Sequence, residues 1–339
     1  MDPFSKLCDW IAIPSVTGAE RDYADAVARE LGALGLGVER QELAPGRFNV
    51  LARGSRPPEV VYCTHLDTVP PFFGPRNERD AVHGRGSCDA KGPALAMIEA
   101  ARKLLASGEE RIGFLLTCGE ETDSAGAALA NERLADPWRP RFTIVGEPTG
   151  NRFVGAHKGV YKAELVAHGV AGHSSQPELP SAVHALVATL ARLLQQDWGR
   201  HALLGPGTLN VGTLQGGVAA NVVAERAVAS LLLRAVENPE VTERKLRACL
   251  EPRVELGAPY KSYGPTEFHV PHGHEPIAVA FGTDAPHLSR WGKPLLYGPG
   301  SILDAHTDHE CIAKRSFERA VHDYETTARE LLARTEVPT

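Results

Sequence analysis

The sequence predicts an α/β domain, with a mixed, mostly parallel sheet flanked by helices, that is interrupted by an inserted α+β domain. In residues 1–158 and 270–339, short apolar runs alternate with amphipathic helical segments, a pattern typical of α/β layers. In residues 159–269 the order is β-α-β-β-α-β, which is typical of a ferredoxin-like sandwich of one antiparallel sheet and two helices. The length of 339 residues is sufficient for both domains.

Two helices and three strands define the first part of the α/β domain. Residues 20–34 and 91–108 carry apolar side chains at helical spacing, and glycines stand at the end of both segments. Residues 59–67, 112–119 and 141–148 are apolar runs of strand length that end in polar residues. Ligands of parallel sheets bind at the carboxyl ends of the strands, so we expect functional side chains after these three runs.

The inserted domain is predicted from its own strands and helices. Residues 159–169, 207–217 and 223–236 have the patterns of strands, and residues 181–196 and 241–251 have apolar side chains at helical spacing. The α/β pattern then resumes with the apolar runs 275–283 and 293–301 and a closing helix over 316–333.

Composition limits the possible partners. The formal net charge is −6 and there is no long basic run, which argues against nucleic acid or an anionic membrane surface. No segment approaches the ~20 apolar residues of a transmembrane helix, and the N-terminus lacks the basic and apolar regions of a signal peptide. The six cysteines form no C-x-x-C pair, so we expect reduced thiols in a cytoplasmic protein.

Acidic and imidazole side chains follow the predicted strands. These residues are His65, Asp67, Asp89, Glu120, Glu121, Glu147 and His306. Each motif alone is weak, because a lone histidine can be structural and adjacent acids can belong to a solvated loop. Together they place two imidazoles and several carboxylates at one edge of a sheet, which is the ligand chemistry of Zn²⁺. A nucleotide-binding protein is not indicated, because no phosphate-binding glycine motif is present.

These motifs in this order resemble the M20 metallopeptidase and deacylase family. The likeness covers almost the whole chain, including the insertion. It is carried by the segments "CTHLDTVP", "GRGSCDAKG", "TCGEETDSAG", "VGEPTGNRFVGAHKG", "GVAGHSS" and "YGPGSILDAHTDHE".

The resemblance implies a zinc-exopeptidase-like domain that binds two divalent ions, with Zn²⁺ expected and Co²⁺ able to substitute. Asp89 would bridge the ions, His65 and Glu147 would complete one site, and Glu121 and His306 the other. Asp67 would orient His65 through its carboxylate. Glu120 would be the general base that takes a proton from water activated by the ions.

The resemblance also assigns roles to the inserted domain, which would act as a lid and a dimerisation domain of a homodimer. His173 would reach across the dimer and stabilise the oxyanion in the partner's active site. Asn221 and Arg234 would bind the carboxylate end of the substrate or the tetrahedral intermediate. Lys158 and Gly300 are further candidates for substrate binding.

The sequence departs from the family pattern in two places. The last motif commonly reads H-x-P-x-E, whereas here Asp308 replaces the proline and His309 becomes a rival of His306 for the ligand role. The spacing of four to Glu310 favours His306. Cys88 stands where a small or aliphatic residue is usual. The three histidines of "HVPHGHE" (269–275) invite a second metal site, which no part of the family pattern supports.

The segments "AHKG", "GTDAPHL" and "GPGSILDAH" resemble acetylornithine deacetylases most. The implied reaction is hydrolysis of a linear amide, Nα-acetylornithine to ornithine and acetate, in arginine biosynthesis. The alternatives are an acetylcitrulline deacetylase, a hydrolase of lysine or ornithine linked to a carrier protein, a succinyl-diaminopimelate desuccinylase, or a dipeptidase or carboxypeptidase. A metal-binding pseudo-enzyme is the alternative from another class, and the retained Glu120 argues against it.

Overall fold

A computed structural model describes residues 2–333, which form two compact units. The second unit consists of Ala156–Glu267 and Ala278–Gly282, and the first unit contains the remaining described residues. No helix in the described part of the chain has both the length and the apolar character needed to cross a membrane.

The first unit is built on a mixed six-stranded sheet of the order β1-β2-β6-β3-β7-β20. The strands β6, β3, β7 and β20 run parallel to one another, and β1 and β2 extend the sheet as an antiparallel hairpin. All side chains of β3, β6 and β7 are buried, as expected for strands that are covered on both faces. The bounds are β1 Gly37–Ala44, β2 Arg47–Arg53, β3 Val60–His65, β6 Ile112–Thr117, β7 Phe142–Val145 and β20 Lys293–Leu296.

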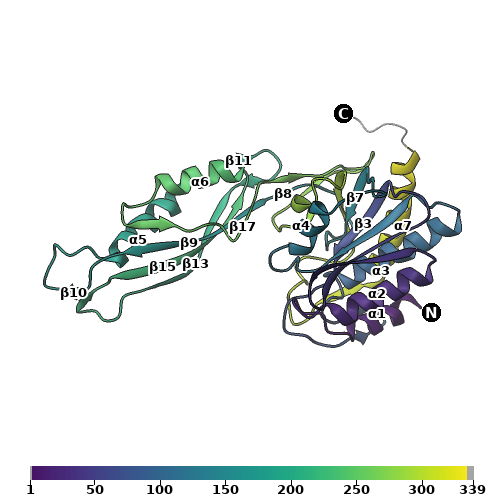
Figure 1. The fold of residues 1–339 in the computed structure, drawn as a ribbon, viewed down its shortest axis with the longest axis horizontal. Helices are drawn as coiled ribbons and strands as arrows, with labels where there is room; N and C mark the ends of the chain where they lie inside the picture. Colours follow the sequence, from purple (N-terminus) through teal and green to yellow (C-terminus); the bar gives the residue numbers. More distant parts are fainter. Residues whose placement is uncertain (1, 334–339) are drawn as a thin grey trace. The chain divides into compact units, whose positions relative to one another are not determined.

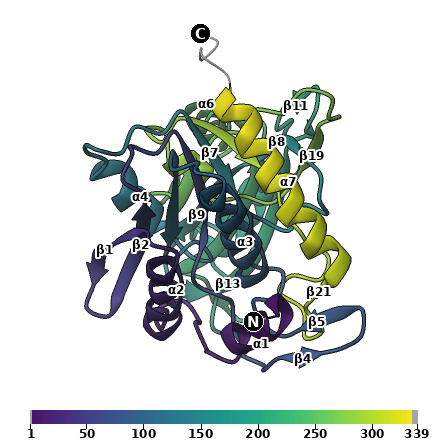
Figure 2. The same cartoon turned by 90° about the vertical axis from the view of Figure 1, so that its right-hand side faces the viewer.

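Three helices lie side by side on one face of this sheet (Figures 1 and 2). They are α2 (Arg21–Ala33), α3 (Lys91–Ala106) and α7 (Lys314–Ala333). The remaining helical elements of the unit are α1 (Pro3–Ile11), α4 (Ala125–Glu132) and the 3₁₀ turn η1 (Ala285–His287). The side chains of α3 are buried over most of its circumference, because α1, α7 and β3 all pack against it.

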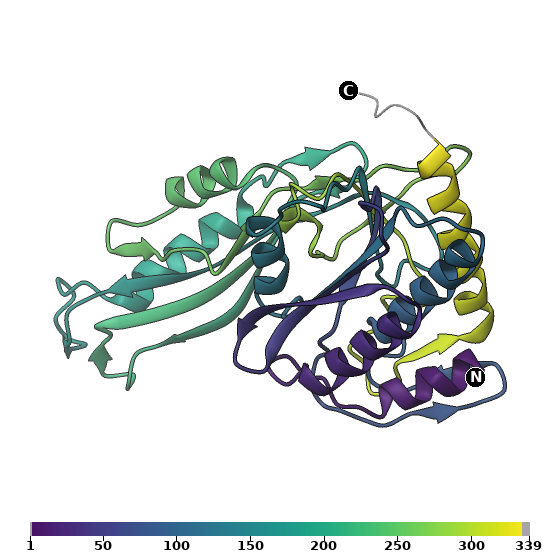
Figure 3. The ribbon, with the colours of Figure 1, turned by 45° about the vertical axis from the view of Figure 1, so that its right-hand side comes forward.

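The fold class predicted from the sequence is confirmed for both parts. In the second unit, β9, β13, β15 and β16 form an antiparallel sheet of the order β13-β15-β9-β16, and β17 pairs with β9 beyond β16. The helices α5 and α6 lie on the same face of this sheet (Figure 3). The bounds are β9 Gly159–His168, α5 Ala182–Gln195, β13 Thr208–Gly216, β15 Arg226–Ala235, α6 Pro239–Ala248, β16 Val254–Leu256 and β17 Lys261–Tyr263.

Burial alternates along β15, whose even-numbered side chains are partly exposed and whose odd-numbered side chains are buried. This period of two is expected when helices cover only one face of an antiparallel sheet. The sandwich order β-α-β-β-α-β is therefore the one that the sequence predicts.

Short strands complete both units. The strand β5 pairs with both β21 and β4, β8 lies between β18 and β19, and β10-β14 and β11-β12 are two-stranded ladders. Their bounds are β4 Arg76–Asn77, β5 Ala81–His83, β8 Val154–His157, β10 Gly172–His173, β11 Arg200–His201, β12 Gly205–Pro206, β14 Val222–Val223, β18 Thr266–Glu267, β19 Ile277–Val279 and β21 Cys311–Ala313.

The boundaries between the units differ from the predicted 158/159 and 269/270. The first two lie at 155/156 and 267/268, and residues 278–282 also belong to the second unit. The sequence pattern places the apolar run 275–283 in the α/β part. Its central residues instead form β19, and because β19 pairs with β8, this run belongs partly to the second unit.

Candidate functional site

The candidate site lies where three parallel strands end. His65 is the last residue of β3, which pairs in register with Thr117 at the end of β6. Glu120 and Glu121 follow β6, and Glu147 follows β7, the other parallel neighbour of β3. Because the carboxyl ends of parallel strands meet at one edge, the fold brings these side chains together.

His65 is buried, and both of its ring nitrogens have partners. Nδ1 donates to the backbone carbonyl oxygen of Asp67 at 2.9 Å. Nε2 lies 2.9 Å from Oδ1 of Asp89 and 3.9 Å from Oε2 of Glu147. Since Nδ1 carries the hydrogen, a neutral ring presents the lone pair of Nε2 to the carboxylates, which is the orientation of a metal ligand.

His306 approaches the same carboxylates from another loop. Its Nε2 lies 3.0 Å from Oε2 of Glu121 and 3.3 Å from Oδ2 of Asp89. The residue has a φ of +63°, a left-handed conformation that is uncommon for a side chain with a Cβ. Such backbone strain persists only where the surrounding structure maintains it, and it is often found at functional sites.

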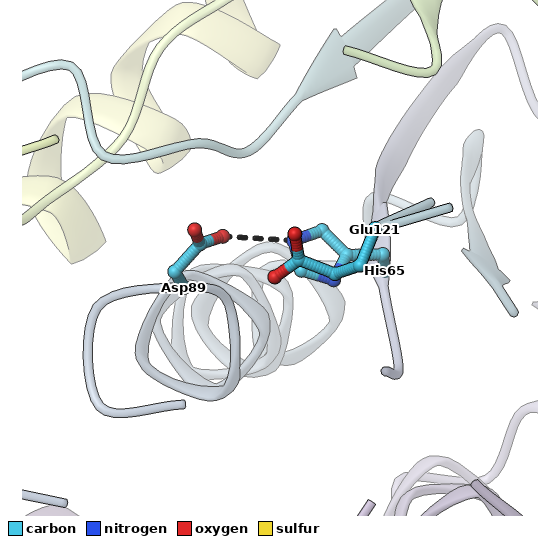
Figure 4. A group of neighbouring side chains, drawn as sticks. All are labelled: His65, Asp89 and Glu121. Carbon is cyan, nitrogen blue, oxygen red and sulfur yellow. Dashed lines mark hydrogen bonds and ion pairs between the residues drawn. The ribbon is translucent and has the colours of Figure 1, made fainter. Parts of the chain in front are cut away.

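Asp89 lies between the two histidines, because Oδ1 faces His65 and Oδ2 faces His306. Ligand atoms of His65, Asp89 and Glu121 all lie within 4.8 Å of one another. Figure 4 shows these three side chains pointing toward a common centre, with Asp89 beside the start of α3. This arrangement is suited to a carboxylate that shares its two oxygens between two cations.

The pKa values reflect the concentration of charge. Burial opposes the protonation of His65, but the hydrogen bond to Asp89 and the nearby carboxylates raise its pKa well above the ordinary value. Hydrogen bonds to Asp89 and Glu121 raise the pKa of His306 to about 10. Burial raises the pKa of Glu147 well above its ordinary value, and burial also raises the pKa of Glu121.

The donor set fits divalent cations. Three carboxylates buried next to two imidazoles carry a negative charge that is costly away from water unless cations compensate for it. Imidazole nitrogen and carboxylate oxygen are ligands of Zn²⁺, and the arrangement around Asp89 offers donors on two sides. The five residues expected to be ligands from the sequence are brought together: His65, Asp89, Glu121, Glu147 and His306.

Asp67 acts differently from the prediction that its carboxylate orients His65. The His65 ring donates to the carbonyl oxygen, while the carboxylate oxygen Oδ1 is 3.7 Å away from Nδ1. The carboxylate instead accepts the backbone N–H groups of Gly119, Glu120 and Glu121 at 3.0 to 3.2 Å. These three bonds and one from Thr17 use both carboxylate oxygens, so Asp67 holds the loop that carries the adjacent acids.

Glu120 lies beside the cluster. Its backbone is fixed by Asp67 and its side chain is half-buried. It is not among the three clustered side chains, but its charge contributes to the raised pKa of Glu147, after burial and the opposing effect of His65. The two adjacent acids differ in one contact: Glu121 lies 3.0 Å from Nε2 of His306, and the charges of both acids contribute to the raised pKa of Glu147.

Sequence reasoning missed two buried groups. In the sequence Glu310 only sets the register of the last motif, yet its carboxylate binds Arg85 and the backbone N–H groups of Gly86, Cys88 and Asp89. Asp284 is buried and accepts a hydrogen bond from Thr117 at 2.7 Å, at the end of β6. Only their acidic character next to apolar segments could have indicated them.

The candidates in the second unit fall into two groups. His173 pairs across β10-β14 with Val222, and Ser174 donates to the carbonyl oxygen of Asn221 at 3.1 Å, so His173 and Asn221 are neighbours. The side chain of His173 is exposed, and its Nδ1 lies 2.8 Å from the Ser175 hydroxyl.

The other two candidates, Arg234 and Lys158, lie at the opposite end of the sheet. Arg234 pairs in register with Val160, and Lys158 donates to the carbonyl oxygen of Pro206 at 2.5 Å. Arg226 marks the end of β15 nearer to Asn221. Eight residues of extended strand, about 27 Å, separate Arg226 from Arg234.

The structure gives packing explanations for several other residues. Gly300 has a φ of +85°, and a Cβ there would lie 2.5 Å from the Cβ of Cys88, so this position requires glycine for the close approach. Its proposed contact with substrate stays a prediction. His309 is exposed and bonds to Asp308 at 2.8 Å, whereas His306 faces the cluster. His274 of the triple-histidine segment packs edge-on against Phe153.

Comparison with known proteins identifies the family. The profile of peptidase family M20/M25/M40 matches residues 61–250. A peptidase M20 domain-containing protein of Schizosaccharomyces pombe is 35% identical over 327 residues, which cover 93% of this chain and 81% of the relative. A probable carboxypeptidase of Aspergillus flavus is 35% identical over 362 residues, covering 93% and 86%.

Solved structures resemble this chain over nearly its full length. The aminopeptidase PepT from Bacillus cereus has a TM-score of 0.80 at 20% identity and covers 97% of this chain and 98% of its own. A dinuclear metal-binding peptidase of the M20 family from Bacillus subtilis has a TM-score of 0.70 at 14% identity, covering 98% and 99%. The match of the profile and of the relatives leads to one conclusion: the chain belongs to peptidase family M20/M25/M40, a family of metal-dependent hydrolases.

Proposed function

We propose that the chain uses two divalent cations to hydrolyse the amide bond on the amino side of an amino acid with a free carboxylate. The observation that carries the proposal is Asp89, whose two oxygens face two different imidazoles at 2.9 and 3.3 Å. His65 and Glu147 would hold one ion, and Glu121 and His306 the other. The structurally similar Bacillus subtilis protein is a dinuclear metal-binding peptidase, which supports the count of two. Zn²⁺ is the proposed ion, with Co²⁺ able to replace it.

Bound divalent ions would supply Lewis-acid chemistry and lower the pKa of water. The part of Glu120 is to accept the proton of the attacking water and to deliver it to the nitrogen of the leaving amine. Its position supports this, because Asp67 fixes its backbone while its carboxylate lies beside the cluster.

Two classes of substrate contain an amide bond to an amino acid with a free carboxylate. The relatives named as probable carboxypeptidases favour short peptides with a free carboxyl terminus. The segments "AHKG" and "GPGSILDAH" favour N-acyl amino acids, above all Nα-acetylornithine. In both classes the leaving amine belongs to an amino acid with a carboxylate. The proposed role of Arg234 is to bind that carboxylate.

The arrangement of the second unit supports the proposal of a site shared between two subunits. His173 with Asn221 and Arg234 with Lys158 stand at opposite ends of one sheet, about 27 Å apart or more, so one chain cannot bring both pairs to one small substrate. We therefore assign His173 to the partner's site. The strand β13 lies at the edge of the sheet, and the exposed apolar residues Leu214 on β13 and Leu194 on α5 are available for contact between subunits.

A hydrolysis screen tests the substrate. The purified protein is supplied with Zn²⁺ or Co²⁺ and offered Nα-acetylornithine, Nα-acetylcitrulline, succinyl-diaminopimelate and dipeptides, each with a free or an amidated carboxylate. We expect turnover only of substrates with the free carboxylate. Equal turnover of amidated substrates would contradict the proposed recognition, and a protein that binds no divalent ion would contradict the site.

Mixing two inactive variants tests the sharing of sites. His173→Ala should keep its metal ions and lose activity, and so should Glu120→Gln. Random mixing after dissociation should restore about a quarter of the wild-type activity, because half of the two-fold dimers contain one complete site. No recovery, with exchange of subunits demonstrated by mass spectrometry of labelled chains, would exclude a shared site.

A further inference from the structure

The side chain of Glu310 is completely buried, and its carboxylate accepts hydrogen bonds from a single loop. Its Oε1 accepts the backbone N–H groups of Gly86, Cys88 and Asp89 at 3.0, 3.1 and 3.1 Å. Its Oε2 accepts a hydrogen bond from Nη1 of Arg85 at 2.7 Å. All four donors belong to residues 85–89, so a single carboxylate fixes the backbone immediately before and at Asp89.

Arg85 is also buried and is held on two further sides. Its Nε donates to the carbonyl oxygen of Pro71 at 3.2 Å, and its guanidinium group lies 5.0 Å from the centre of the Phe73 ring. A buried carboxylate is costly unless it is hydrogen-bonded or paired with an opposite charge, and Arg85 provides such a charge. The negative charge of Glu310 is therefore neutralised next to Asp89.

Glu310 also belongs to the segment that carries His306. The strand β21 begins at Cys311, which pairs with His83 of β5, and the Gly84 N–H donates to the carbonyl oxygen of Glu310 at 3.0 Å. The Asp89 loop leaves this ladder after β5, and the His306 loop enters it before β21. Backbone and side chain of Glu310 thus join two loops that are far apart in the sequence.

The arrangement repeats what Asp67 does on the other side of the site. Asp67 gathers three consecutive N–H groups of the loop with Glu121, and Glu310 gathers three N–H groups of the loop with Asp89. Glu310 differs in having an arginine partner and in lying on the same segment as a second ligand. The hydrogen bonds of the Glu310 carboxylate reach Asp89 at its backbone N–H, so these bonds act on the Asp89 ligand through its backbone.

We propose that Glu310, neutralised by Arg85, is a positioning residue that holds Asp89 and His306 at the mutual distance that binding of two cations requires. The proposal rests on the proposed metal-dependent function. The two oxygens of Asp89 face His65 and His306 at 2.9 and 3.3 Å, so a small rotation of the Asp89 backbone changes both sides of the site at once. Substitution of residues that orient metal ligands in this way typically lowers metal affinity by about 10- to 100-fold.

The test compares two conservative changes of one side chain. Glu310→Asp keeps the charge opposite Arg85 but withdraws the oxygens from the three amides. Glu310→Gln keeps the reach but turns an N–H donor toward the guanidinium group. We expect both variants to bind Zn²⁺ and Co²⁺ about 10- to 100-fold more weakly in calorimetric titrations, and to show altered visible absorption bands with Co²⁺. Arg85→Lys, which keeps a buried cation, should retain most of the affinity.

A matched control separates positioning from general loss of stability. Leu331 is fully buried in α7, and its apolar side chain cannot form a hydrogen bond to the 85–89 loop. Leu331→Ala therefore destabilises the same unit through loss of apolar packing. This control should lose thermal stability and keep its metal affinity and its Co²⁺ spectrum. Glu310 variants that lose stability but bind Co²⁺ as tightly as the wild type would overturn the proposal.

If Glu310→Gln does not fold, Glu310→Asp and Arg85→Lys carry the comparison. The wild-type titration distinguishes a failure of the proposed metal-dependent function from a failure of the role assigned to Glu310. A wild type that binds no divalent ion contradicts the proposed function. A wild type that binds two ions, together with folded Glu310 variants of equal affinity, contradicts only the role assigned to Glu310.

Discussion

At the scale of single residues, the adjacent acids Glu120 and Glu121 show how two identical side chains acquire different chemistry. Both have their backbone N–H groups bonded to Asp67. Glu121 contacts His306 at 3.0 Å and belongs to the cluster of His65, Asp89 and Glu121, whereas Glu120 is not one of these three clustered side chains. Like charges placed next to each other repel, and this repulsion is offset when one of the two carboxylates binds a cation.

Replacement of one or the other of these acids by glutamine should therefore have different effects. Glu120→Gln should keep both metal ions and lower kcat by about 10²- to 10⁴-fold, because the proton acceptor is lost. Glu121→Gln should lower the metal content first, because a charged ligand becomes neutral. Metal analysis of the dialysed proteins, with steady-state kinetics on the same samples, distinguishes the two. Loss of metal from Glu120→Gln would assign it to the ligands instead.

Gly300 is a second residue whose environment yields a prediction. Both Gly300 and Gly150 have positive φ values, +85° and +68°, but a Cβ meets Cys88 at 2.5 Å only at Gly300. Gly150→Ala should cost about 1 kcal/mol of the free energy of unfolding for its backbone conformation. Gly300→Ala should cost about 1–3 kcal/mol more because of overpacking. Chemical denaturation of both variants measures the difference, and equal losses would contradict the close approach.

At the scale of elements, loops at the strand ends are held by buried carboxylates rather than by strand pairing. Burial raises the pKa of Asp67 above its ordinary value, although His65 and Thr17 oppose this effect. Its oxygens accept four hydrogen bonds and thereby fix the turn after β6. A loop fixed in this way can present ligands without reorganising when a cation binds.

Asp67→Asn should weaken that loop. The amide of asparagine offers one acceptor oxygen, so its NH₂ group must face donors that were previously satisfied. We expect a loss of about 1–3 kcal/mol in the free energy of unfolding and weaker binding of Zn²⁺. Thr17→Val, which removes a single bond to the same carboxylate, is the matched control and should change metal affinity less. If Asp67→Asn bound Zn²⁺ as tightly as Thr17→Val, the position of the loop would not depend on the Asp67 carboxylate.

At the scale of the whole molecule, the proposed metal ligands and most of the proposed substrate-binding residues lie in different units. The first unit contains all five proposed ligands, and the second contains four of the proposed substrate-binding and catalytic residues: His173, Asn221, Arg234 and Lys158. Each unit has its own apolar core. Metal binding should therefore stabilise the first unit directly.

Removal of metal by a chelator tests this division. At an ion concentration of 100 times Kd, binding contributes about 2.7 kcal/mol, which corresponds to about 5–10 °C in Tm for a unit of this size. We expect calorimetry to show this loss on chelation and recovery with Zn²⁺. Hydrogen exchange should lose protection in the loops around His65, Asp89 and Glu121 but not in β9 and β15. Uniform loss in both units would contradict an effect confined to the site.

Local patterns predict most of the fold. The helices α2, α3, α5, α6 and α7 and the strands β3, β6, β7, β9, β13 and β15 lie where apolar spacing predicts them. The hairpin β1-β2, the helix α1 and the small sheet around β8 are not predicted from the sequence. Charged residues interrupt β1, and β8 is too short for a periodic signal. The pairing of β19 with β8 joins residues more than 100 positions apart, so no local pattern could place it.

The residue types at the strand ends can be read from the sequence, because apolar runs end where polar side chains begin. The sequence therefore predicts the acids and histidines that the fold brings to one edge. Their partners depend on the three-dimensional fold: the carbonyl oxygen of Asp67 for His65, three amides for the Asp67 carboxylate, and the Asp89 loop for Glu310. Hydrogen bonds depend on distances of about 3 Å between groups that are remote in the chain, and composition and spacing do not encode such distances.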